Sequence, residues 1–109
     1  LIMSVNPNVH STEIVLAGGG AGSAIWRQIF ADTFNLPVRT VYGSAEGGAF
    51  GAALVAGVTG GIWPDLAATV ELIKPESETL PIAENVPVYA AQYQRYAKYY
   101  DALKWSYKR

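Results

Sequence analysis

The apolar residues of this chain form short continuous runs that alternate with helix-like repeats. Residues 13–17 make an apolar, β-branched run that ends at glycines, which is typical of a buried strand. From Ser23 the period changes to three or four residues, as on one face of an amphipathic helix. The apolar positions of this face are Ile25, Trp26, Ile29, Phe30 and Phe34. Ser23 is a suitable N-cap, Pro37 predicts that the helix ends before Leu36, and the period places Trp26 in the core.

The same order of elements then repeats. Residues 38–42 form a second apolar, β-branched run. Ser44 is expected to cap a second helix, with Glu46 in its first turn, and Gly60 and Gly61 end that helix. Two strands that are each followed by a helix predict a parallel β-α-β-α unit, in which helices cover a sheet. The predicted fold class is therefore α/β.

The rest of the chain divides into two parts. Residues 63–86 hold three prolines and most of the acidic side chains, which predicts a surface excursion. Residues 87–107 are expected to form a terminal helix with Pro87 in its first turn. Its apolar stripe consists of Tyr89, Tyr93, Tyr96, Tyr100, Leu103 and Tyr107. We expect this stripe to pack onto the same domain, with self-association into a homodimer as the alternative.

Composition excludes several classes of function. The formal net charge of −1 argues against a nucleic-acid partner, and the absence of cysteine excludes disulfides and thiolate metal sites. A lone His10 without clustered acids argues against a metal site. No apolar run is long enough for a membrane span, and the chain opens without a basic leader. We expect one cytoplasmic domain, residues 1–109, with no membrane partner.

Residues 18–22 contain four glycines between the first strand and the first helix. Such a run permits positive φ angles and close approach of a ligand, and the helix N-terminus beyond it favours an anion such as phosphate. The run is not a Walker loop, because no Lys-Ser or Lys-Thr pair follows it. A dinucleotide fingerprint fits only in part, since Ser23 stands at its third glycine and Tyr42-Gly43-Ser44 stand where its acid is expected.

Three linked motifs fit one known family. Residues 17–32 read AGGGAGSAIWRQIFAD, residues 46–54 read EGGAFGAAL, and residues 60–66 read GGIWPDL. In this order and spacing, residues 14–67 resemble the C-terminal domain of the FGGY family of carbohydrate kinases, most closely the xylulose kinases. The resemblance implies part of an actin-like ATPase (ribonuclease H-like) domain with an extra C-terminal helix.

The resemblance also implies an activity and a site. The family transfers the γ-phosphate of ATP to a sugar hydroxyl, here of a pentulose such as D-xylulose. Gly19, Gly20, Ala21, Gly22 and Ser23 would line the adenosine and α-phosphate pocket and bind ATP or ADP. Two departures predict fewer side-chain contacts: relatives often carry a longer side chain at Gly22, and some carry a polar residue at Ala24.

The remaining parts of the implied active site are expected outside this chain. Mg²⁺ would be held mainly elsewhere, and the sugar pocket and catalytic aspartate would belong to sequence that precedes Leu1. Asp32 lies nearly three helical turns beyond the glycine run, too far to act as the base. The chain alone is therefore expected to supply no catalytic residue and no metal ligand, and to be inactive.

The sequence is compatible with two alternatives for Glu46 and for the whole chain. Glu46 is either an acid that interacts with a helix dipole or a residue that faces the cleft near the metal or phosphates. The whole chain, as an alternative to the kinase, could be a non-catalytic dinucleotide-binding or structural α/β module. Such a module would assemble through its tyrosine-rich helix.

Overall fold

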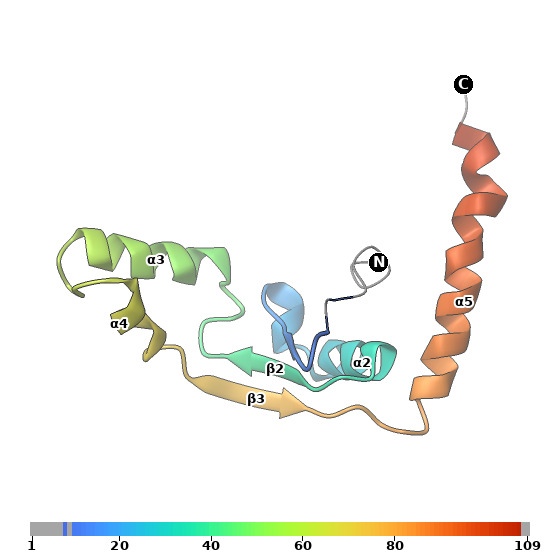
Figure 1. The fold of residues 1–109 in the computed structure, drawn as a ribbon, viewed down its shortest axis with the longest axis horizontal. Coiled ribbons are helices and arrows are strands. Elements are labelled where there is room, and N and C mark those ends of the chain that lie inside the picture. The colour runs from blue at the N-terminus through green and yellow to red at the C-terminus, as the bar shows by residue number, and fades with distance from the viewer. Residues whose placement is uncertain (1–7, 9, 108–109) are drawn as a thin grey trace.

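The computed structural model describes residue 8 and residues 10–107, and a three-stranded sheet lies at its centre (Figure 1). The strands are β1 (Ile14–Val15), β2 (Val38–Val41) and β3 (Pro75–Thr79), in the order β1-β2-β3. β1 runs parallel to β2, with Ile14 opposite Val38, as the sequence predicts. β3 runs antiparallel to β2, so the sheet is mixed and not wholly parallel.

Helix α2 (Ala24–Phe34) follows the glycine run and has the predicted ends. The hydroxyl of Ser23 accepts a hydrogen bond from the backbone N–H of Trp26 at 3.4 Å, which makes it the N-cap. Asn35 stops the helix in the left-handed conformation, at φ +51°. α2 contacts β2 and β3 and therefore links the glycine run to the sheet.

Helix α3 (Gly48–Thr59) begins later than the sequence predicts. Ser44 is not its cap, because the Ser44 hydroxyl donates to the carbonyl of Val41 and closes the turn after β2. Glu46 therefore lies in that turn, ahead of the helix, and not in its first turn. A short helix, α4 (Leu66–Val70), follows α3 and contacts it, and is capped by the carboxylate of Asp65.

Residues 63–86, which the sequence predicts to be a surface excursion, are mostly exposed and contain α4 and β3. The sequence did not predict β3, because its residues, PESET, lack apolar alternation. They pair with β2 through polar contacts instead. Ser77 hydrogen-bonds Thr40 at 2.6 Å, and Glu78 accepts from the guanidinium of Arg39 at 3.0 Å. An edge strand that is held in this way needs no apolar face of its own.

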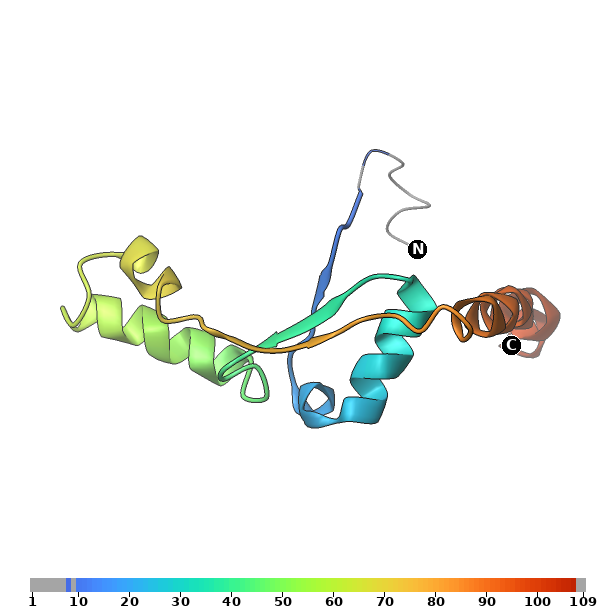
Figure 2. The same ribbon diagram turned by 90° about the horizontal axis from the view of Figure 1, so that it is seen from below.

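The terminal helix α5 (Val86–Leu103) begins with Pro87 in its first turn and continues into a 3₁₀ turn, η2 (Lys104–Tyr107). It projects from the end of the structure opposite to α3 and α4 (Figures 1 and 2). The expectation that its tyrosine stripe packs onto the same domain is wrong for the described chain. Tyr96 is 70% exposed and Tyr100 is 72% exposed.

The described chain has a small core for its surface. The buried apolar residues are Ala21, Ala31 and Val38, whereas Trp26, which the sequence places in the core, is 53% exposed. The radius of gyration is 18.3 Å, against roughly 13 Å for a compact domain of this length. The accessible surface is 8354 Å², roughly 2,500 Å² more than a compact monomer of this mass presents.

Asp32 is the main polar link between α2 and the segment that leads into α5. Its side chain is buried and accepts hydrogen bonds from the backbone N–H of Ile82 at 2.7 Å and from the amides of Asn85 and Gln28, each at 2.8 Å. Burial alone would raise the pKa of this carboxyl, but the three hydrogen bonds outweigh burial and lower the pKa below its ordinary 3.8. Asp32 therefore stays ionised, and its carboxylate is engaged by protein donors.

We predict that Asp32→Asn loosens α5, because one amide N–H₂ would then face a donor of Gln28, Ile82 or Asn85. The expected loss of stability is about 1–3 kcal/mol near neutral pH. Since the folded pKa is lowered, the contribution of the carboxylate is complete above pH 3.8 and is lost as pH falls through the folded pKa.

Melting temperatures of the wild type and the variant, measured by circular dichroism from pH 7 to pH 2, should therefore converge in acid. Asp101→Asn is the matched control, because the Asp101 side chain is 73% exposed and pairs with Lys104 on the same helix. If the melting temperatures of the wild type and Asp32→Asn differed by the same amount at every pH, the assigned role of Asp32 would be contradicted.

Candidate functional site

Two turns lie side by side at the carboxyl ends of the parallel strands β1 and β2. The first comprises residues 18–23 and leads into α2, and the second comprises residues 42–47 and leads into α3. The backbone N–H of Gly18 donates to the carbonyl of Ser44 at 2.7 Å and joins the turns directly. In open α/β sheets, ligands bind outside the carboxyl ends of parallel strands, so this pair of turns is the candidate site.

The first turn has a defined backbone conformation. Gly18 has φ +85°, and residues Gly19–Gly22 form a single 3₁₀ turn, η1. The N–H of Ala21 donates to the carbonyl of Gly18 at 2.9 Å, and the N–H of Ser23 donates to Gly20 at 3.1 Å. The N–H groups of Gly19 and Gly20 precede the first of these bonds, so they have no acceptor within their own turn. They are available to a ligand.

Most glycines in this turn are not required by the fold of the described chain. The expected positive φ occurs at Gly18 but not at Gly19, Gly20 or Gly22. A Cβ atom at any of those three positions would meet no other atom within 4 Å. Gly57 differs, because a Cβ there would overlap the ring of Trp63. The bare backbone at residues 19, 20 and 22 therefore faces open space, where a ligand could reach it.

The five residues predicted to bind the nucleotide are together in this turn, but they are not equally accessible. Gly19, Gly20 and Gly22 are exposed, and Ser23 is half-buried with its hydroxyl engaged in capping α2. Ala21 is 3% exposed, so its methyl group packs inside the turn. A ligand would meet mainly backbone here.

Arg27 is a residue of this site that the sequence analysis did not single out. Its guanidinium Nη1 donates to the carbonyl of Ala21 at 2.6 Å, so the side chain reaches back from α2 to the turn. A signal was present in the sequence, since a cation in the first turn of a helix opposes the helix dipole. A cation at this position is unfavourable unless another interaction compensates for it.

The other polar candidates do not form a metal centre. Within residues 10–107, no group of three or more His, Cys, Asp or Glu side chains is placed to hold a metal ion. His10 and Glu46 are exposed, and the carboxylate of Asp32 accepts hydrogen bonds from protein donors.

No helix of the described chain is long and apolar enough to cross a membrane.

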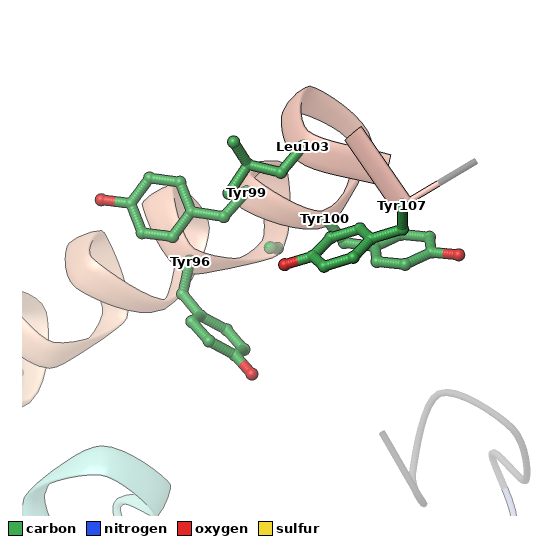
Figure 3. Close-up of a pocket in the computed structure, with 6 residues that line it drawn as sticks. Tyr96, Tyr99, Tyr100, Leu103 and Tyr107 are labelled. Atoms are coloured by element: carbon green, nitrogen blue, oxygen red, sulfur yellow. The ribbon is translucent and has the colours of Figure 1, made fainter. Parts of the chain in front are cut away.

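One apolar surface of the described chain lies on the terminal helix, away from this turn. A shallow hollow of about 290 Å³ runs along one side of α5 and η2, and all its lining residues belong to those two elements (Figure 3). They are Tyr96, Ala97, Tyr99, Tyr100, Leu103 and Tyr107. The hollow offers hydroxyls and ring faces but no charged group, so it does not suit a phosphate.

A family model agrees with the motifs. The model for the FGGY family of carbohydrate kinases, C-terminal domain, matches residues 2–60. The match covers more than half of the chain, and the chain belongs to this family.

Curated relatives with high sequence identity are autoinducer-2 kinases. That of Enterobacter sp. (strain 638) is 42% identical over 92 residues, which are 83% of this chain and 17% of the relative. That of Salmonella typhimurium is 39% identical over 94 residues, which are 85% of this chain and 18% of the relative. The chain thus spans less than one fifth of the length of these relatives.

Solved structures confirm the predicted α/β fold class. A xylulose kinase from Lactobacillus acidophilus matches with a TM-score of 0.77 and 23% identity, over 97% of this chain and 22% of its own. A gluconate kinase from the same organism matches with a TM-score of 0.72 and 22% identity, over 94% of this chain and 21% of its own. The open arrangement in Figure 2 is therefore shared with part of larger kinases.

We predict that Gly20→Val in the complete kinase weakens ATP binding by about tenfold or more, because a β-branched side chain would cover the N–H groups of Gly19 and Gly20, at which the nucleotide is predicted to bind. Sugar binding should change little. The expected loss of ATP affinity comes only from the space that the valine side chain would occupy, and not from backbone strain, since Gly20 does not have a positive φ. Isothermal titration with each ligand measures both affinities.

Gly57→Ala provides the contrast, because its methyl group would overlap Trp63 and destabilise the fold without selecting between ligands. A Gly20→Val variant that loses ATP and sugar affinity equally, with a lowered melting temperature, would show that the residue serves folding only.

Proposed function

We propose that this chain supplies the nucleotide-binding wall of a kinase that transfers the γ-phosphate of ATP to a hydroxyl of a small sugar. The observation that carries the proposal is the bare glycine turn at the carboxyl end of β1, in a chain that belongs to a carbohydrate kinase family. A dinucleotide-binding module fits less well, because no acid stands at the end of β2, where Tyr42 and Gly43 lie.

The turn is suited to an anionic ligand. The free N–H groups of Gly19 and Gly20 and the N-terminus of α2 provide hydrogen-bond donors and a positive partial charge. Phosphoryl transfer depends largely on positioning and charge stabilisation. We infer that residues 19–23 hold the adenosine and α-phosphate and so orient the γ-phosphate toward the remainder of the kinase.

Among the described residues, no group of three or more His, Cys, Asp or Glu side chains is placed to hold a metal ion, whereas Mg²⁺ usually takes one or two carboxylates together with substrate phosphates. When bound with ATP, Mg²⁺ neutralises charge on the phosphate oxygens. We propose that its ligands and the catalytic base lie in the rest of the kinase. Glu46 is exposed in the neighbouring turn, residues 42–47, and its role as a cleft residue stays a prediction.

The large exposed surface supports a place within a bigger domain. The excess of roughly 2,500 Å² is comparable to a permanent interface. It includes the apolar side of α2, where a hollow of about 210 Å³ is lined by Trp26, Ile29, Phe30, Thr33 and Phe34. We propose that other parts of a nucleotide-binding domain cover this side. Residues 1–109 would then be one portion of that domain, with residues 87–107 as its terminal helix.

Two acceptors are candidates for the phosphoryl group. The sequence motifs favour D-xylulose, and the structural similarity to a xylulose kinase is compatible with it. The relatives with about 40% identity are named autoinducer-2 kinases. Because this identity is higher than the 23% shared with the xylulose kinase, we propose autoinducer-2 as the first acceptor to test and D-xylulose as the second.

The first prediction from this proposal concerns the complete kinase. Purified protein should release ADP from ATP in a manner that depends on one of these acceptors, as measured by a coupled ADP assay. Gluconate and glycerol serve as comparison substrates. No acceptor-dependent ADP release with any of the four compounds would contradict the proposed activity.

The second prediction concerns residues 1–109 alone. This chain should bind ADP with a dissociation constant of about 1 mM, because a single wall leaves the phosphates in water. It should not transfer phosphate, because the alignment of base, acceptor and γ-phosphate is missing. NMR titration should shift the amides of residues 19–23 and spare residues 89–107. Shifts confined to α5, or sugar-dependent ADP production, would contradict this division of roles.

A further inference from the structure

We propose that Arg27 is a positioning residue of the nucleotide site. In this role it fixes the shape of the glycine turn and places a positive charge behind the bound phosphates. The proposal rests on the proposed function and extends it to a residue outside the glycine run. It is carried by the contacts of the guanidinium, by its charge balance and by its being, among the described residues, the side chain that donates to a carbonyl inside the turn.

The side chain of Arg27 points back from the first turn of α2. Its backbone N–H donates to the carbonyl of Ser23 at 3.0 Å, as the helix requires. Its Nη1 donates to the carbonyl of Ala21 at 2.6 Å, across the N-terminus of the helix. Its Nε is buried and has no hydrogen-bond partner in the described part of the chain. The guanidinium is therefore held against the inner side of the turn.

The charge of Arg27 is not neutralised by a carboxylate within residues 10–107. The ion pairs found there involve Arg39 and Lys104. A cation close to a helix N-terminus is also disfavoured by the helix dipole, and a buried donor without a partner lowers stability further. An anion bound in front of the turn would offset both effects, because it would interact favourably with the guanidinium and with the helix N-terminus.

The glycine turn needs such a support. Gly19, Gly20 and Gly22 have no side chains to pack, so without such a support the turn would have more conformations to lose when a ligand binds. Among the side chains of the described residues, that of Arg27 donates to a carbonyl inside the turn. Holding Ala21 in place also holds its N–H against Gly18, which fixes where the N–H groups of Gly19 and Gly20 point.

The test uses the complete kinase with three variants, Arg27→Gln, Arg27→Lys and Arg39→Gln. Arg39 is the matched control, since it is a charged arginine on β2 that pairs with Glu13 at 3.1 Å and Glu78 at 3.0 Å, away from the turn. Steady-state kinetics give KM for ATP and for the acceptor separately. Hydrogen exchange reports the amides of residues 18–23.

Arg27→Gln should raise KM for ATP about tenfold, because a charge-assisted hydrogen bond and a nearby cation are lost. KM for the acceptor should stay within about twofold, and exchange at Ala21 and Ser23 should become faster. Arg27→Lys keeps the charge without the planar fork, so its KM for ATP should lie between those of the wild type and Arg27→Gln. Arg39→Gln should leave all of these values unchanged.

An unchanged KM for ATP in Arg27→Gln, or equal increases for ATP and the acceptor, would overturn the role of Arg27. If Arg27→Gln does not fold, Arg27→Lys decides alone, and a KM for ATP equal to that of the wild type would overturn the proposal. A wild-type kinase without ATP-dependent activity would instead overturn the proposed function. The two failures are distinguishable, because one appears in the wild type and the other only in the variants.

Discussion

The buried carboxylate of Asp32 is the interaction on which the arrangement of this chain depends. It sits near the end of α2 and accepts hydrogen bonds from the segment that leads into α5, 50 residues or more further along the sequence. With so few buried apolar residues, packing alone does not fix that segment. The ordered α2 in turn carries Ser23 and Arg27 at its other end, next to the glycine turn. One helix therefore connects the structural anchor and the candidate site.

Local patterns predicted the elements whose causes are local. The apolar run of β1, the Ser23 cap and the stop before Pro37 were all correct, because each depends on a few neighbouring residues. β3 was missed because its pairing depends on Arg39 and Thr40 in a distant strand. The start of α3 was wrong because Ser44 satisfies the turn after β2 and not the helix. Packing of Trp26 and of the tyrosine stripe was wrong because periodicity identifies an apolar face but not what covers it.

In the candidate site, too, the sequence predicted the features with local causes and missed those that depend on how side chains are placed. Glycine content predicted a ligand-binding turn, and the five predicted residues comprise one 3₁₀ turn and the residue that follows it; that they bind a ligand stays a prediction. Composition did not distinguish Gly18, which needs its φ of +85°, from the glycines that leave the backbone bare. It also did not show that Ala21 points inward or that Arg27 reaches its carbonyl. Those facts depend on side-chain directions that only the folded turn determines.

The hydrogen bond between Gly18 and Ser44 has a mechanical consequence. The arm formed by α3 and α4 leaves the sheet through residues 42–47, and that same segment is bonded to the glycine turn. A swing of the arm about residues 42–44 would therefore break a hydrogen bond at the site. A ligand that stiffens the first turn would also stiffen the base of the arm. Force applied to α3 would in the same way reach the site through this hydrogen bond.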